Sequence, residues 1–414
     1  MRSRIIWIFI IIGIACSCSS SSDVRRKIPN DNQYQKTSFN PSLYLYHNSE
    51  TSSILFFKID PAELLFTRIN PESPFKSNLE IEVLLFETVK EINSFVDTIK
   101  VNRSYVNRDV SSMDIFGEIT LPLEGDKDYF LEIYCYDVNK KSGKRFDLLV
   151  PKSSLTHRMN FLVTDASTNQ PIFDFHKIGD GKVLIENNRN QGKDILIHEI
   201  DLSIVKFPPP PFASRQVFLP ELPKETIETN FFKENHAYFI TTDLEKKEGI
   251  TIAVRNRFFP EVKTFEQMSL PTRYITTKSE YEELVSGVHT KKSLDDFWIK
   301  CGGSTERGKQ LIRVYYTRVS LANRYFSTIN PGWKTDRGAI YIIYGKPNQV
   351  QNRNNQETWV YGDITNPNSL SFTFTKTENL YSDNQYELQR NSGYRIHWQR
   401  AVTNWINGRV YERK

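Results

Sequence analysis

Short apolar runs broken by turn residues follow one another from about residue 39. Over residues 39–155 the clearest runs alternate apolar and polar positions, which predicts β-strands because strand side chains point alternately to opposite faces. These runs cover residues 43–46, 54–59, 79–86 and 130–134. No convincing amphipathic helix interrupts them, so this pattern favours a first immunoglobulin-like β-sandwich domain over residues 39–155.

A second block with the same texture fills residues 156–268. Its strand-like runs cover residues 161–163, 182–185, 195–200, 237–240 and 250–254, and they predict a second β-sandwich. Four prolines at 208–211 stand between Phe207 and Phe212. Because proline donates no ladder hydrogen bond, this run cannot be a central strand. We interpret it as a stiff loop that crosses between sheets, with a polyproline ligand as the alternative.

Beyond Pro271 the pattern changes to helices. Ser279 with Glu282, and Ser293 with Asp296, fit helix-capping patterns. A break at Gly302 and Gly303 precedes a long helix that Ser304 opens. Its apolar residues recur at spacings of three and four, which predicts one wide buried face: Leu311, Ile312, Tyr315, Tyr316, Val319, Ala322 and Phe326. A closing helix is predicted over residues 394–411.

Between these helices lies a helix stop followed by an apolar run. Pro331 and Gly332 are expected to end the long helix. Residues 339–344 are apolar on both faces, which predicts a central strand, and residues 357–361 and 370–374 would extend its sheet. Helices around a sheet make the last domain, residues 269–414, α+β.

The turn before this run carries candidate chemistry. Asp336 can accept hydrogen bonds from nearby backbone N–H groups, and Gly338 allows a positive φ. In this structural interpretation Trp333 fills a gap in the core, Asp336 caps the turn and Arg337 pairs with an acid. The alternative is a site in which Trp333 stacks on a sugar beside Asp336 and Arg337. We favour the structural interpretation, because no general-base histidine, nucleophile elbow or second carboxylate lies at a recognisable spacing.

The same residues carry a family resemblance. Gly332-Trp333-Lys334-Thr335-Asp336 resembles the signature of the GWxTD-domain family of bacterial envelope proteins, and Arg337-Gly338 and the turn at residues 344–347 resemble its continuation. The resemblance covers about residues 275–414. It implies a lipoprotein or secreted architecture and supplies no catalytic residue or cofactor. The signature residues are therefore Gly332, Trp333, Thr335, Asp336, Arg337 and Gly338.

The N-terminus is typical of an export signal. Arg2 and Arg4 precede an apolar run at residues 5–15, which is about half the length of a membrane-spanning helix. Residues 1–15 therefore predict a signal peptide. Small residues before Cys16 resemble the lipobox of bacterial lipoproteins, in which the cysteine receives diacylglycerol. We expect Cys16 to be the lipid attachment site, with Cys18 as the alternative.

The residues after the lipobox indicate a tether. Residues 16–38 are mostly polar and predict a flexible linker. Asp23 is its only early acid, and the basic residues at 25–27 follow it. This pattern favours an outer-membrane lipoprotein that faces the periplasm, with surface exposure as the alternative.

Charge and cysteine content narrow the function classes. Lys and Arg total 54 against 49 acidic residues, and this mild net charge of +5 excludes a strongly basic nucleic-acid binder. The four cysteines include no Cys-x-x-Cys pair and the seven histidines no His-Glu-x-x-His, so the sequence supports no zinc site and no other metal site. Cys135 is expected to be a buried free thiol, with a bridge to Cys301 as the alternative.

Together these features predict a non-enzymatic envelope lipoprotein that acts as a protein-binding or assembly scaffold. Its expected partners are the membrane, through the lipid, and other envelope proteins, with no nucleic acid and no cofactor. The alternative is a carbohydrate- or peptidoglycan-active enzyme, or a glycan-binding module, with its site around Trp333, Asp336 and Arg337.

Overall fold

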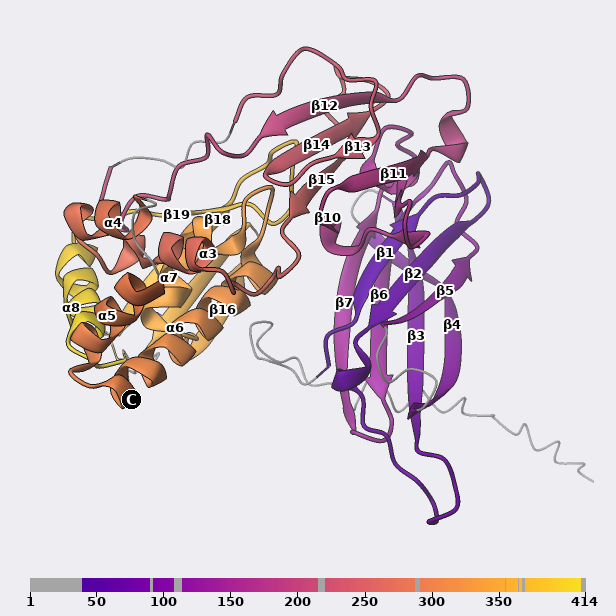
Figure 1. Cartoon of the computed structure of the whole chain (residues 1–414). Helices are drawn as coiled ribbons and strands as arrows, with labels where there is room; N and C mark the ends of the chain where they lie inside the picture. Colours follow the sequence, from indigo (N-terminus) through magenta and orange to yellow (C-terminus); the bar gives the residue numbers. More distant parts are fainter. Residues whose placement is uncertain are drawn as a thin grey trace, which may run out of the picture.

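A computed structural model describes residues 39–89, 92–107, 114–214, 220–286, 291–353, 355–363, 365–366 and 369–410. These residues form a mainly β chain with several antiparallel sheets, followed by a C-terminal region that contains six α-helices (Figure 1). The coarse fold class predicted from the sequence is therefore confirmed. The predicted signal peptide, tether and both candidate lipid sites lie outside the described residues.

The first β region pairs two sheets. The strands β1 (Ser42–Tyr46), β2 (Ser53–Ile59) and β5 (Ile115–Leu121) form one sheet in the order β1-β2-β5. The other sheet has the order β4-β3-β6-β7, from β3 (Lys76–Val89), β4 (Ile92–Val106), β6 (Asp128–Asp137) and β7 (Ser142–Val150). A short helical turn, η1 (Pro61–Glu63), follows β2. The core between the sheets includes Leu55, Val83 and Ile133, together with Cys135 as a buried free thiol, as predicted.

The second β region is built from shorter strands. Three-residue helical turns η2 (Arg158–Asn160), η3 (Phe173–Phe175) and η4 (Asn188–Asn190) lie among them. One sheet has the order β13-β11-β8-β9, from β8 (Leu162–Asp165), β9 (Gln170–Pro171), β11 (Gly181–Glu186) and β13 (Phe231–Phe232). The other has the order β10-β15-β14-β12, from β10 (His176–Ile178), β12 (Leu196–Asp201), β14 (His236–Thr241) and β15 (Ile250–Arg255). Only β10 and β15 pair in parallel among the described strands.

The C-terminal region packs helices around one antiparallel sheet of order β16-β17-β18-β19. Its strands are β16 (Gln349–Arg353), β17 (Gln356–Tyr361), β18 (Leu370–Lys376) and β19 (Tyr386–Leu388). The helical elements are α3 (Phe265–Ser269), η5 (Leu270–Tyr274), α4 (Lys278–Val285), α5 (Lys291–Gly302), α6 (Thr305–Phe326), η6 (Gly332–Lys334), α7 (Asp336–Tyr344) and α8 (Tyr394–Ile406). The predicted long helix is α6, capped by Ser304, and the predicted closing helix is α8.

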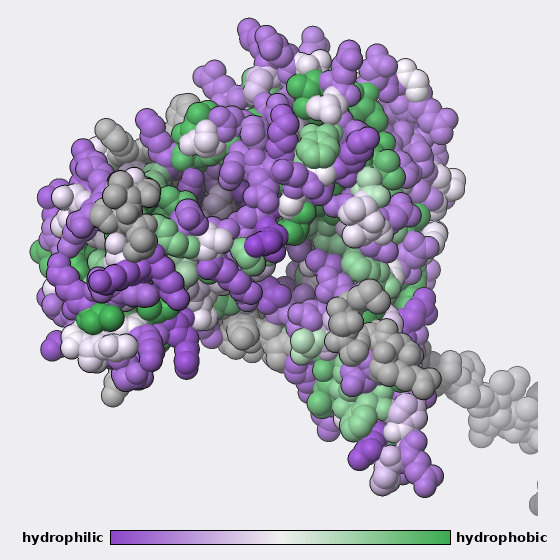
Figure 2. All heavy atoms as spheres, viewed as in Figure 1, coloured by the Kyte–Doolittle hydropathy of each residue, from purple (hydrophilic) through white to green (hydrophobic). Residues whose placement is uncertain are grey.

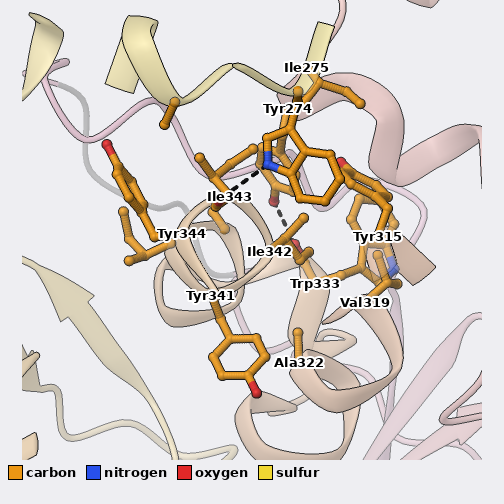
Figure 3. Packing of buried hydrophobic residues seen from close by; sticks show 14 of the residues in the cluster. Tyr274, Ile275, Tyr315, Val319, Ala322, Trp333, Tyr341, Ile342, Ile343 and Tyr344 are labelled. Atoms are coloured by element: carbon orange, nitrogen blue, oxygen red, sulfur yellow. Dashed lines mark hydrogen bonds between the residues drawn. The ribbon is translucent and has the colours of Figure 1, made fainter. Parts of the chain in front are cut away.

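The predicted strand at residues 339–344 was wrong, because these residues belong to helix α7. All nine residues of α7 are buried. Figure 3 shows Tyr341, Ile342, Ile343 and Tyr344 pointing from α7 to different sides, each towards other buried residues. Residues 339–344 are all apolar because α7 is covered on every side, so this stretch shows no helical period and looks like a buried strand.

Three predicted helix signals were also displaced. Helix α6 ends at Phe326, where Ser327 turns to an extended conformation, five residues before Pro331. Helix α4 is capped by Thr277 in a reciprocal capping box with Glu280, so Ser279 is inside it. Ser293 likewise lies inside α5. In each case the Ser or Pro is of a type that occurs at helix ends, but it lies a few positions from the boundary that the structure shows.

The proline run is a loop, as predicted, and it lies against the C-terminal region. Pro208 and Pro211 are buried, and the Pro211 carbonyl accepts a hydrogen bond from the Asn391 N–H (3.2 Å). The Phe207 ring packs 5.2 Å from the ring of Trp333. The loop thus connects the second β region to the signature.

Buried polar groups join the two β regions. His47 is fully buried, and its Nδ1 lies 2.8 Å from the Ser53 hydroxyl. Lys152 donates to the Ser52 carbonyl (2.8 Å), and Arg189 donates to the Lys152 carbonyl (2.7 Å). Burial, with the nearby charges of Lys152 and Arg189, lowers the pKa of His47 to about 3. The joint therefore requires a neutral His47.

This requirement predicts acid-sensitive stability. Unfolding restores an ordinary histidine pKa near 6.5, so the contribution of His47 is complete above that pH and is lost as pH falls towards 3. Acidification from pH 7.5 to 4.5 should cost the wild-type protein about 2–3 kcal/mol more than His47→Gln. Urea unfolding followed by circular dichroism measures this difference. His397, exposed on α8, gives the control His397→Gln; equal pH dependence in wild type and His47→Gln would contradict the assignment.

Candidate functional site

The signature begins with two glycines that let three backbone segments meet. A Cβ on Gly332 would lie 1.8 Å from the Ala322 carbonyl oxygen of α6. A Cβ on Gly338 would lie 1.9 Å from the Gly332 carbonyl oxygen. Neither backbone oxygen can move away as a flexible side chain could. Only glycine therefore fits at both positions, and the turn η6 is held between α6 and α7.

Thr335 is the N-cap of α7. Its hydroxyl accepts a hydrogen bond from the Gly338 N–H (3.1 Å) and donates to the Gly332 carbonyl (2.8 Å). The first bond satisfies one of the N–H groups that a helix start leaves without a partner. Thr335 thereby fixes where α7 begins and how it leaves η6.

Trp333 is a core residue, with 5% of its surface exposed. Its backbone N–H donates to the Asn323 side-chain oxygen of α6 (3.2 Å), and its backbone carbonyl accepts a hydrogen bond from the Tyr274 hydroxyl. Figure 3 shows Trp333 and Tyr274 in the cluster around α7. Its ring contacts Phe207, so the tryptophan connects α6, η5 and the proline loop.

Asp336 makes a buried bidentate ion pair. Its two carboxylate oxygens lie 2.6 and 3.1 Å from the guanidinium nitrogens of Arg390, and one oxygen also accepts the Leu388 N–H (2.8 Å). Asp336 is 3% exposed. Burial raises the pKa of Asp336, and the Arg390 guanidinium and the Leu388 N–H oppose that rise. The pair fastens the start of α7 to the end of β19.

Arg337 points to other partners. Its guanidinium lies 3.6 Å from the Glu357 carboxylate of β17 and donates to the Asn384 carbonyl (2.7 Å) and to the Asn384 side chain. It also stacks 4.0 Å from the centre of the Tyr386 ring. Arg337 and Glu357 are 3% and 2% exposed at their side chains. This second ion pair fastens α7 to the middle of the sheet.

The predicted roles of the signature residues are thus partly corrected. Trp333 fills the core and Arg337 pairs with an acid, as the structural interpretation expected. Asp336 does not cap the turn, since Thr335 does and Asp336 binds Arg390. Gly338 does not have a positive φ; it is required because the backbone of Gly332 passes so close.

Sequence reasoning missed the partners of these residues. Arg390 lies 54 residues from Asp336, and Asn384 lies 47 residues from Arg337. No spacing rule for a helix or hairpin connects positions so far apart. The sequence contains one indication of such partners: Asp336 and Arg337 are adjacent charged residues, and buried charges need ion-pair or hydrogen-bond partners.

Arg255 attaches the second β region to the loop that enters the signature. From the end of β15 it donates to the carbonyls of Thr328 and Ile329, both at 2.9 Å. Burial lowers the pKa of Arg255 to about 9. Around it, Ala237, Phe239 and Ala253 of β14 and β15 share a small core with Ile329. The β14–β15 hairpin and the signature loop therefore pack as one unit.

Two cavities lie near these elements, and Trp333, Asp336 and Arg337 line neither. A cavity of about 460 Å³ is bounded by residues after Phe212 and by the segment that carries Arg390. A larger cleft of about 800 Å³ separates the first β region from the C-terminal region. Figure 2 shows the hollow between these two bodies. Within the described residues, no group of three or more His, Cys, Asp or Glu side chains is placed to hold a metal ion.

The comparison with protein families agrees with this geometry. Residues 236–407 match the family model of the GWxTD domain. This region of the chain is therefore a GWxTD domain, as its signature predicted. The matched region starts at His236 in β14, so it includes the hairpin that Arg255 attaches to the signature loop. No curated protein matches the chain.

The Asp336–Arg390 pair can be tested by a double-mutant cycle. Asp336→Leu and Arg390→Met should each cost about 3–5 kcal/mol, because each leaves one buried charge without its partner. The double variant should cost at least about 2 kcal/mol less than the sum of the two. Five of the six tryptophans lie between residues 298 and 405, so tryptophan fluorescence during urea unfolding reports on this region. Strictly additive costs would show that the two side chains do not interact.

Proposed function

We propose that this protein is a non-enzymatic cell-envelope lipoprotein that binds or assembles other envelope proteins. The observation that carries the proposal is the burial of the signature. Asp336 forms a buried ion pair with Arg390, and Arg337 forms a buried ion pair with Glu357. Residues placed in this way stabilise a domain, and they are not accessible to a substrate.

The same observation weighs against a carbohydrate site at the signature. A sugar-binding tryptophan needs an open ring face, whereas Trp333 is 5% exposed and faces Phe207. A general acid or base must reach the proton that it transfers. Asp336 is enclosed by Arg390 and the Leu388 N–H. A scaffold role fits this arrangement better than an enzyme or a glycan-binding module.

The outer surface of the first β region supports a role in protein binding. We propose that its two sheets are an immunoglobulin-like sandwich, a fold that presents broad sheet faces to partners. The strand register places Phe95, Phe86, Phe130 and Leu149 side by side across the sheet β4-β3-β6-β7. Phe95 and Leu149 are 60% and 68% exposed. Exposed apolar rows of this kind mark surfaces where other proteins dock.

The proposed anchor is a lipid on Cys16, or on Cys18 if the signal peptide is cleaved there. Among the described helices, none is long and apolar enough to span a membrane. We propose that the acylated protein sits in the outer membrane and faces the periplasm, with the polar residues 16–38 as its tether.

Labelling with a palmitate analogue, followed by chemical crosslinking of intact cells, tests both parts of this proposal. The wild-type protein should carry the label, fractionate with membranes and form discrete crosslinks to other envelope proteins. Cys16→Ser should lose the label, and Cys18→Ser should keep it; the reverse would move the site to Cys18. Label on the double variant would contradict the lipoprotein assignment, and a wild-type protein without protein crosslinks would contradict the scaffold.

A further inference from the structure

The two sheets of the first β region are open along one side, and that side faces the large cleft. The edge strands β1 and β7 lie on the side of this region turned towards the C-terminal region (Figure 1). Residues of both strands line the cleft of about 800 Å³. The cleft is therefore bordered by the edges of two different sheets.

The backbone of β1 is directed into this cleft. The His47 N–H, just beyond β1, donates to the Met159 carbonyl (2.7 Å) and so points away from the neighbouring strand β2. Backbone groups alternate in direction along a strand, so the N–H and C=O groups of Leu43 and Leu45 point to that same side. Both residues line the cleft. An edge of this kind is a template for one more strand.

The walls beside this edge are apolar. Phe146 and Leu148 of β7 stand opposite Ile133 and Leu131 of β6, on the inner face of their sheet. Phe146, Leu148 and Ile133 line the cleft together with Leu43 and Leu45 of the facing sheet. A strand entering here would place every second side chain between the sheets, where apolar groups are stabilised beside Phe146 and Leu148.

Charged side chains of both signs line the cleft, and Lys144 is the cation that shares the inner face of β7 with Phe146 and Leu148. Lys144 of β7 lines the cleft, and its ammonium lies 3.5 Å from the Asn40 side-chain oxygen. Among the described residues no carboxylate lies within 4 Å of this ammonium. Burial lowers the pKa of Lys144, and the more distant carboxylates of Asp174 and Glu63 oppose that shift. A partly buried ammonium is stabilised by an anion.

We propose that the cleft binds an extended segment of a partner protein as an added strand on β1. The segment has alternating apolar side chains and an acidic residue that meets Lys144. This proposal rests on the scaffold function and names where and how the scaffold holds a partner. The protein's own residues 16–38 do not fit this description, because they contain little apolar content.

Two ion pairs connect the β regions to the C-terminal region beside the cleft. Arg324 of α6 lies 3.3 Å from the Glu63 carboxylate of η1, and Arg158 of η2 pairs with Asp383 before β19. Both pairs connect a β region to the C-terminal region. They are the charged contacts that bring the two sides of the cleft together around the β1 edge.

The direct test uses the full-length protein in detergent and a fluorescein-labelled octapeptide, Thr-Val-Thr-Glu-Thr-Val-Thr-Val. Leu43→Pro removes one N–H from the free edge and leaves the β1–β2 ladder intact. Leu43→Ala is the matched control, since it loses the same side chain and keeps the N–H. Fluorescence anisotropy should show at least tenfold weaker binding for Leu43→Pro and less than threefold weaker binding for Leu43→Ala.

Three further outcomes complete this test. A peptide with proline at its centre should not bind, and Lys144→Met should remove any preference for Glu over Gln in the peptide. In case Leu43→Pro does not fold, hydrogen exchange on the wild-type protein should show the Leu43 and Leu45 amides protected by the octapeptide. Equal binding by both Leu43 variants, unchanged exchange, or no wild-type binding up to about 1 mM overturns the proposal.

A photocrosslinking experiment separates this proposal from the scaffold function itself. The photoreactive residue p-benzoylphenylalanine is placed at position 43 in the cleft, or at position 95 on the exposed sheet face, and irradiated in isolated envelopes. Crosslinks from position 43 that the unlabelled octapeptide removes support the cleft. Crosslinks from position 95 alone overturn the cleft proposal and leave the scaffold standing. No crosslinks from either position contradict the scaffold.

Discussion

The close approach of α6, η6 and α7 is the constraint on which the C-terminal region depends. Gly332 and Gly338 allow backbone to pass backbone where any Cβ would collide with a carbonyl oxygen. Once η6 lies in this position, Trp333 enters the core and Thr335 caps α7. The adjacent Asp336 and Arg337 then reach two different parts of the sheet, at Arg390 and Glu357. The signature residues therefore connect the helices of the C-terminal region to its sheet.

Local pattern predicted most clearly those elements in which buried and less buried positions follow a regular period. Strand β2 alternates and helix α6 repeats at spacings of three and four, and both were found where expected. Strands β1, β3 and β6 were also found where expected, although their centres or ends are buried on both faces. Helix α7 has no solvent-exposed face, so its apolar pattern could not distinguish a helix from a buried strand. The partners Arg390 and Asn384 could not be predicted either, because only the folded sheet brings them to α7.

The structural unit around the signature begins before Pro271, where the sequence pattern changes from strands to helices. Arg255 binds the carbonyls of Thr328 and Ile329, and β14 and β15 share a core with that loop. The family match starts in β14, which agrees with this packing. The signature is buried, so the surfaces left for partners are the exposed sheet face and the cleft between the bodies. We therefore place the proposed function in these surfaces.

The unfolding free energy of Gly338→Ala, followed by tryptophan fluorescence, shows whether the C-terminal region depends on the close approach of α6, η6 and α7. The new Cβ would meet the backbone oxygen of Gly332, so we expect a loss of about 3 kcal/mol or more. Gly393→Ala is the control, since Gly393 has an ordinary helical φ of −61° and its Cβ would meet only the Asn391 side chain. A Gly338→Ala protein as stable as Gly393→Ala would show that the fold does not depend on this close approach.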